Sequence, residues 1–242
     1  MNESPTQPNP HHYEAFDVLA VFCLAVLPDL ANSFLVPSAP STGSVALIDL
    51  LLLFIVRSFQ VSVPILLILK LRKVRWADYG VVKFRPVLDP LEALGITVLG
   101  YVALTVLVNG LLMLRFDFAA EYGALPGTTA DTEYGLGVFA LVVVASCANG
   151  FAEELAMRSY LLVRICELSG SKWVAAILTT ALFAAYHSYQ GRYGIVSAAA
   201  LGAVFAAYFI KTKRLWPVAI AHALIDVVGL LQFVIQSEEY TY

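Results

Sequence analysis

The sequence has few charged residues for its length. Only 14% of its 242 residues are Asp, Glu, Lys or Arg, whereas 60% are hydrophobic, and the mean hydropathy is +0.77. Soluble domains carry about 25% charged and about 45–50% apolar residues. A soluble fold of this size could not hide so much apolar surface from water, but a bilayer accepts it. The scarcity of charge therefore excludes an ordinary soluble domain and predicts an integral membrane protein.

Other features are also missing. The three cysteines have no regular spacing and form no CxxC motif, so a disulfide framework is not expected. Lys and Arg do not gather into a basic face, which argues against a nucleic-acid partner. The first 14 residues contain no Lys or Arg and therefore lack the basic start of a signal peptide.

Seven apolar runs have about the length that crosses the hydrocarbon core of a membrane. They fall at 15–36, 45–69, 90–114, 136–163, 172–190, 193–210 and 215–235. Short breaks with turn residues or charges separate them, and no internal repeat stands out. We predict an all-α, polytopic transmembrane bundle of about seven helices, with one transmembrane domain over 15–235 and polar tails at 1–14 and 236–242.

The basic residues are distributed unevenly around these runs. With a cytoplasmic N-terminus, three groups lie inside: Lys70, Arg72, Lys73, Arg75, Lys83 and Arg85; Arg164 and Lys172; Lys211, Lys213 and Arg214. Only Arg115 and Arg192 fall outside, where the loop 115–135 is acidic. Cytoplasmic loops of membrane proteins are enriched in Lys and Arg. We therefore predict a cytoplasmic N-terminus, a C-terminus on the far side and residence in the plasma membrane.

The fourth run contains charged residues where the membrane would penalise them. A charge at the bilayer centre costs roughly 2.5–3.5 kcal/mol on insertion scales, yet the stretch ANGFAEELAMR holds Asn149, Glu153, Glu154 and Arg158. Glu154 and Arg158 are four residues apart and can pair on one helix face. Glu153 is turned by about 100° from its neighbour. One carboxylate is thus neutralised, and the other is free to serve as a general base.

Two later runs supply histidines. Phe183 and His187 are four residues apart in FAAYH, and His222 and Asp226 are four apart in HALID. A carboxylate one turn from a histidine can hold its tautomer and orientation. Together with Glu153, the two histidines match a hydrolytic zinc site by residue type. They equally match a metal-free site in which Glu and His activate water.

A purely structural interpretation competes with these. Each polar residue could simply hold helices together through hydrogen bonds. For the polar residues of the first two runs this is the interpretation we favour: Asp17, Asp29, Asn32, Asp49, Arg57 and Gln60.

Three motifs carry a family resemblance. In chain order, EELAMR, FAAYH and HALID resemble the EExxxR, FxxxH and Hxxx(N/D) motifs of the CPBP family of intramembrane proteases. That family includes type II CAAX prenyl endopeptidases and bacterial Abi-type proteins. The stretch RWADYG ahead of the third run is also similar to a Trp-to-Gly segment of the family. The resemblance covers about 75–226, within a family-like core of about 75–235.

The resemblance implies roles for the residues that match the motifs. Glu153 would activate water with His187 as its partner. Glu154 and Arg158 would support the site, as would the neighbouring Asn149. The resemblance leaves the cofactor open between a divalent metal such as zinc and a metal-free Glu/His mechanism.

The last motif implies a role at the developing oxyanion. His222 and Asp226 would stabilise the oxyanion or help Glu153 and His187 to bind the metal, with Phe183 supporting the site. Asp226 stands where the prenyl endopeptidases have Asn, and an ionised Asp cannot donate a hydrogen bond to an oxyanion. Its expected role is therefore to orient His222 or to bind metal.

The expected function is that of an intramembrane endopeptidase. Its partners would be a membrane-anchored peptide or protein substrate and the lipid bilayer. A non-proteolytic immunity or scaffold protein is the alternative, whereas a transporter lacks the expected inverted repeat. Counting depth along full-length helices places His187 nearer the outer face than Glu153 and His222. A common cavity open to the cytoplasm therefore requires a tilted, kinked or shortened helix.

Overall fold

The computed structural model describes residues 10–35, 47–116 and 136–239. Within these ranges all regular secondary structure is helical, and no strand occurs. The predicted all-α architecture is confirmed. The acidic residues of the predicted outer loop from 117 onward and the ends of both predicted tails lie outside these ranges.

Seven helical rods make up the described part of the chain. The first consists of α1 (Pro10–Val21), the π-helical η1 (Phe22–Val26) and α2 (Leu27–Leu35); the fourth consists of α5 (Leu136–Glu154), the π-helical η4 (Leu155–Leu161) and α6 (Leu162–Ser169). The others are α3 (Leu47–Leu71), α4 (Leu88–Met113), α7 (Lys172–Tyr186), α8 (Gly191–Thr212) and α9 (Leu215–Glu239), with short 3-10 segments at η2 (Trp76–Tyr79) and η5 (Ser188–Gln190).

Six of these rods are long and apolar enough to cross a membrane, and α7 is the exception among the described helices. Its 15 residues span about 22 Å at about 1.5 Å per residue, less than the roughly 30 Å of a hydrocarbon core. It ends at Tyr186, four residues before the predicted end at 190. Gly191 then starts α8 with a φ of 74°, which favours glycine. The chain thus turns back before α7 is long enough to cross a hydrocarbon core.

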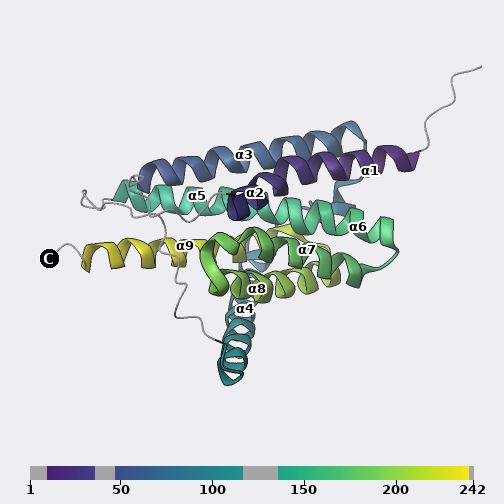
Figure 1. Ribbon diagram of the computed structural model, residues 1–242. Coiled ribbons are helices and arrows are strands. Elements are labelled where there is room, and N and C mark those ends of the chain that lie inside the picture. The colour runs from purple at the N-terminus through teal and green to yellow at the C-terminus, as the bar shows by residue number, and fades with distance from the viewer. Residues whose placement is uncertain (1–9, 36–46, 117–135, 240–242) are drawn as a thin grey trace, which may run out of the picture.

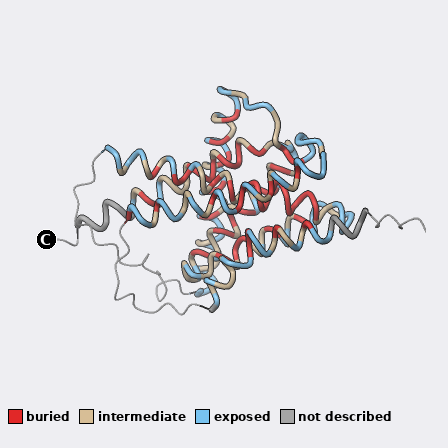
Figure 2. Tube along the Cα trace, turned by 90° about the horizontal axis from the view of Figure 1, so that it is seen from above, coloured by how far each residue is buried: buried red, intermediate tan, exposed pale blue. Residues whose placement is uncertain are grey.

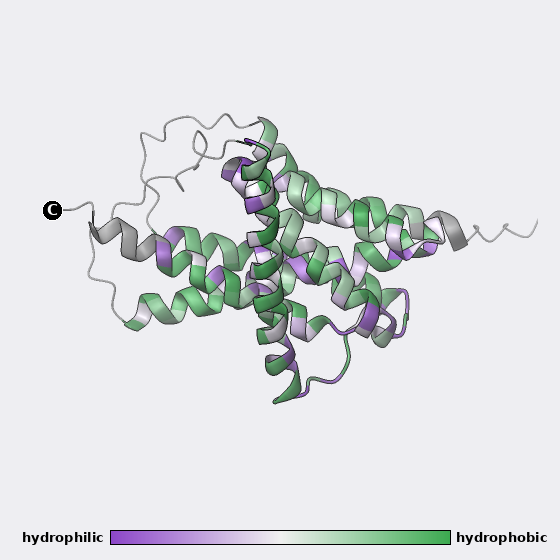
Figure 3. Cartoon of the chain, turned by 90° about the horizontal axis from the view of Figure 1, so that it is seen from below, coloured by the Kyte–Doolittle hydropathy of each residue, from purple (hydrophilic) through white to green (hydrophobic). Residues whose placement is uncertain are grey.

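Most rods run side by side, and α4 crosses them at a steep angle (Figure 1). α5 packs between α3 and α9, α7 packs against α6 and α8, and α4 contacts α8 and α9. Buried residues gather where the rods cross near the middle of the molecule (Figure 2). Hydrophobic residues dominate the outer helix faces (Figure 3); examples are Leu53, Phe59, Val98 and Val106, each at least 60% exposed. Such a surface suits lipid rather than water.

A close approach of α5 to α9 places the fourth and seventh rods in register. A Cβ added to Gly150 would lie 2.8 Å from the backbone nitrogen of Ala223 and 2.9 Å from the carbonyl oxygen of Ala219. Only a residue without a side chain fits there. Small residues at helix interfaces allow such backbone contact in membranes, and this contact brings the HALID motif beside the two glutamates.

Candidate active site

The hairpin of α6 and α7 sets the relative height of Glu153 and His187. Gly170 ends α6 with a φ of 69°, and Ser171 caps α7 by accepting a hydrogen bond from the amide of Val174. Residues equally far from the turn of an antiparallel hairpin lie at the same height. Glu153 precedes Gly170 by 17 residues and His187 follows it by 17. The depth difference expected from the predicted runs therefore does not arise, because the fourth rod extends to Ser169, six residues past its predicted end at 163.

The predicted pair of Glu154 and Arg158 is present and fully buried. Arg158 Nη1 donates to Glu154 Oε1 at 2.9 Å, and neither side chain is exposed to solvent. The guanidinium also lies over the ring of Phe183, 4.3 Å from its centroid. Gly202 of α8 leaves room for it, since a Cβ there would lie 2.9 Å from Arg158 Nη2. The π-helical η4 begins directly after Glu154, and such segments are frequent at functional sites.

His222 lies between the two glutamates. Its Nδ1 is 2.8 Å from Glu154 Oε1, and its Nε2 is 3.7 Å from Glu153 Oε2. An ionised carboxylate can only accept, so Nδ1 is the donor toward Glu154. Glu154 therefore accepts hydrogen bonds from both Arg158 and His222. Residue spacing within one helix predicted the first contact but could not predict the second, because His222 lies on another rod.

Asp226 forms its hydrogen bond with Asn149 rather than with His222. Asn149 Nδ2 donates to Asp226 Oδ2 at 3.0 Å, while Asp226 Oδ1 is 3.6 Å from His222 Nε2. That separation is too long for a direct hydrogen bond but close enough for electrostatic attraction to an imidazolium. Asn149 thus links α5 to the end of the HALID motif.

Tyr186 is a site residue that the motif analysis missed. Its hydroxyl donates to Glu153 Oε2 at 3.0 Å, and the side chain is buried. The signal lay in the hairpin, because Tyr186 follows Gly170 by 16 residues and so faces Glu153 across the turn. One oxygen of Glu153 therefore has a fixed donor, which orients the carboxylate.

His187 is held by its own helix. Its Nδ1 lies 2.7 Å from the carbonyl oxygen of Phe183, which assigns the ring proton to Nδ1 and leaves Nε2 as an acceptor in the neutral form. The ring stacks on Tyr186 and packs against Phe183, with centroids 4.6 Å apart in both cases. Phe183 also packs edge-on against His222. The four-residue spacing of Phe183 and His187 in FAAYH thus serves to fix the orientation of the imidazole ring.

A small cavity lies beside Glu153. Its volume is about 20 Å³, and its polar lining comes from Asp29, Arg57, Ser58, Asn149, Glu153 and Tyr186. A cavity needs about 10–15 Å³ by this measure, and two to four polar partners, to hold one water molecule. The Glu153 side chain is 22% exposed. The carboxylate therefore has room for a single water next to it.

Arg57 and Asp29 were expected to link helices through polar contacts. They form an ion pair between two helices, and both line this cavity. Arg57 Nη2 pairs with Asp29 Oδ2 at 3.0 Å, linking α3 to α2. Arg57 also donates to the carbonyl oxygens of Leu24 and Ala25 at 2.9 Å and 3.1 Å. Both carbonyls belong to the π-helical η1, whose irregular turn frees them for this contact.

Across the described ranges, no group of three or more His, Cys, Asp or Glu side chains is placed to hold a metal ion. Glu153, His187 and His222 have the residue types of a zinc site, but their arrangement does not fit one. The chemistry below therefore assigns no step to a metal.

Residues 135–228 match the family model described as type II CAAX prenyl endopeptidase Rce1-like. The match contains all three motifs, which confirms the resemblance, and it begins after the RWADYG segment. The matched segment runs from the start of α5 into α9 and so includes every element that contributes a motif residue. No curated protein and no solved structure matches the chain.

Proposed function

We propose that this chain, with its Rce1-like domain, is an intramembrane endopeptidase that hydrolyses a peptide bond of a membrane-anchored protein or peptide. One observation carries the proposal: Glu153 borders a cavity with room for one water, accepts a hydrogen bond from Tyr186 at Oε2, and has His222 Nε2 3.7 Å from that same oxygen. A carboxylate, a water and an adjacent imidazole are the parts that general-base hydrolysis requires.

Glu153 acts as the general base. It takes a proton from the water in the cavity while the oxygen of that water attacks the carbonyl carbon of the substrate. His187 stacks on Tyr186, the donor to Glu153, and offers Nε2 as an acceptor to the water or the substrate. Glu153 then returns the proton to the nitrogen of the leaving amine as the carbon–nitrogen bond breaks, so no proton is gained or lost over the cycle.

His222 stabilises the oxyanion. As an imidazolium it donates Nδ1–H to Glu154 and presents Nε2–H to the negative oxygen. The carboxylates of Glu153, Glu154 and Asp226 surround the ring and offset its charge. Asp226 acts on His222 through its charge rather than as a donor, which explains how Asp serves where the prenyl endopeptidases have Asn.

The substrate reaches the site from the cytoplasmic side. His222 lies seven residues after Leu215, the first residue of α9, which is about 10 Å along the helix. That end of α9 carries Arg214 and Trp216, and basic and aromatic side chains mark the inner membrane interface. The scissile bond would therefore lie just below the surface, in a substrate anchored in the same membrane.

Purified protein in lipid nanodiscs tests the proposal with a fluorogenic CAAX peptide, prenylated or not. Glu153→Gln keeps the size of the side chain and should lower kcat about 10²–10⁴-fold, whereas Glu167→Gln, on the half-exposed Glu167 of α6, should leave it unchanged. The metal content of the same samples is measured alongside cleavage. Equal cleavage by wild type and Glu153→Gln would refute the catalytic assignment, and absent cleavage with specific partner capture would favour the scaffold alternative.

A further inference from the structure

A large groove lies between α4 and α8, beside the place where the two helices touch. Its volume is about 730 Å³, within the range of about 300–1,000 Å³ typical of ligand sites. Small and aliphatic side chains line most of it: Gly95, Leu99 and Ala103 of α4, and Ala200, Ala203 and Ala207 of α8. The steep crossing of α4 holds the two helices apart on either side of their contact (Figure 1). The groove is therefore largely apolar, and the two helices that form it are long enough to cross a membrane.

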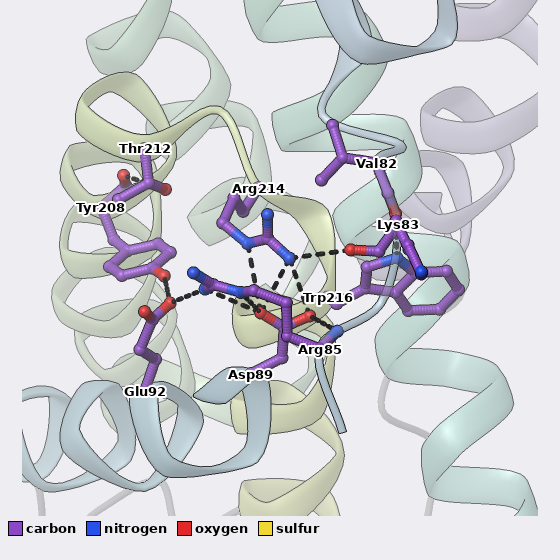
Figure 4. A network of polar contacts seen from close by, with 9 residues as sticks. All are labelled: Val82, Lys83, Arg85, Asp89, Glu92, Tyr208, Thr212, Arg214 and Trp216. Atoms are coloured by element: carbon purple, nitrogen blue, oxygen red, sulfur yellow. Dashed lines mark hydrogen bonds and ion pairs between the residues drawn. The ribbon is translucent and has the colours of Figure 1, made fainter. Parts of the chain in front are cut away.

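Polar groups occur at one end of the groove only. They are Glu92, Tyr208 and Lys211, and Figure 4 shows the network that surrounds the first two. Glu92 accepts a hydrogen bond from Arg85 at 2.8 Å and another from the hydroxyl of Tyr208. Its charge is therefore already matched, and it does not call for a cationic ligand.

The charges at this end leave an excess of positive sign. Asp89 is fully buried and is held by Arg85 and Arg214, with Arg214 Nη2 2.9 Å from each of its oxygens. Two carboxylates thus face two guanidinium groups. Lys83 and Lys211 are added to this balance, and both are exposed. An anionic group is the complement to this end of the groove.

We propose that the groove binds an anionic phospholipid, with one hydrocarbon chain between α4 and α8 and the phosphate beside Lys211. An apolar channel with a basic mouth requires an amphipathic ligand, and basic pockets between transmembrane helices bind anionic headgroups. The groove lies on the opposite face of α8 from the candidate active site. Gly202 and Phe205 face Arg158, whereas Ala203 and Ala207 face the groove. The proposal therefore does not depend on the peptidase activity.

Native mass spectrometry of the purified full chain tests the headgroup. Phosphatidylglycerol and phosphatidylcholine with identical chains are titrated, and phosphatidylglycerol should bind more tightly. Lys211→Gln should weaken phosphatidylglycerol binding about fivefold, the effect of one basic side chain near an anionic headgroup, and leave phosphatidylcholine unchanged. Lys70→Gln, on the exposed end of α3, is the matched control. Equal binding of the two lipids, or equal weakening by both variants, overturns the assignment of the headgroup.

A second pair of variants tests the hydrocarbon chain. Ala203→Trp fills the groove and should lower the binding of both lipids, whereas Ala181→Trp places the same side chain at an exposed alanine of α7 away from the groove. Thermal unfolding of both variants verifies that each is folded. Unchanged lipid binding by folded Ala203→Trp overturns the proposal, and so does an equal loss in Ala181→Trp.

Discussion

Removal of Arg158 should destabilise the protein because it leaves a buried carboxylate without its strongest partner. Arg158 and Glu154 are both fully buried, and their charged atoms are 2.9 Å apart. Breaking such a pair by removing one member costs about 3–5 kcal/mol. Arg158→Met keeps an unbranched apolar side chain but removes the guanidinium, so the loss measured includes its contact with Phe183 as well as the charge. His222 at 2.8 Å remains beside Glu154, which places the expected loss nearer to about 3 kcal/mol.

The double variant Glu154→Gln/Arg158→Met separates the charge from the packing. A buried pair replaced as a whole is often close to neutral, whereas a single buried charge is costly. The double variant should therefore be more stable than Arg158→Met alone, with a coupling energy of about 1–3 kcal/mol.

The free energy of unfolding would be measured by titration with denaturing detergent in mixed micelles and followed by circular dichroism. Arg75→Met is the control, because Arg75 is exposed and pairs with the exposed Asp78, so no measurable loss is expected. If Arg158→Met and the double variant lost the same stability, the charge of Glu154 would not be the cause and the reasoning would fail.

Three further outcomes are expected. Tyr186→Phe removes the donor that orients the catalytic glutamate and should lower kcat about 10-fold, the worth of a hydrogen bond to a charged group, with KM and thermal stability little changed; an unchanged kcat would argue against an orienting role. Gly150→Ala should lower both stability and activity, because its Cβ would meet the backbone of α9 at 2.8 Å, whereas Gly137→Ala, where nothing lies within 4 Å, should not; equal effects would show that the α5–α9 contact is not critical. Reporter fusions at Lys73 and Tyr242 should lie on opposite sides of the membrane, and the same side for both would contradict the seven-helix topology.

Local patterns determined much of the architecture. A membrane requires about 20 apolar residues per span, so the seven runs located the seven rods, with most boundaries a few residues from those observed. Spacing along one helix was equally informative. Residues four apart on a helix are neighbours whatever surrounds them, and the ion pair of Glu154 with Arg158 followed from that rule alone.

Contacts between rods were decided by the tertiary structure. The sequence suggested that Glu153 and His222 share a site, but their separation of 3.7 Å depends on the approach of α9 to α5 at Gly150. The premature end of α7 likewise depends on the turn before Gly191. The pattern of apolar residues indicates how far a helix extends and which residues share one of its faces. It does not indicate which other helix packs against that face.

The same reason explains the residues that were missed or understated. Tyr186 reads in the sequence as one more aromatic residue of an apolar helix, and Arg57 as a residue that joins helices. Each gains its place at the site from a partner on another rod: Tyr186 from Glu153 across the hairpin, and Arg57 from the carbonyls and carboxylate of the first rod. The residues of the motifs could be named from the sequence, whereas the groups that orient them and the cavity that admits water exist only once the rods are packed.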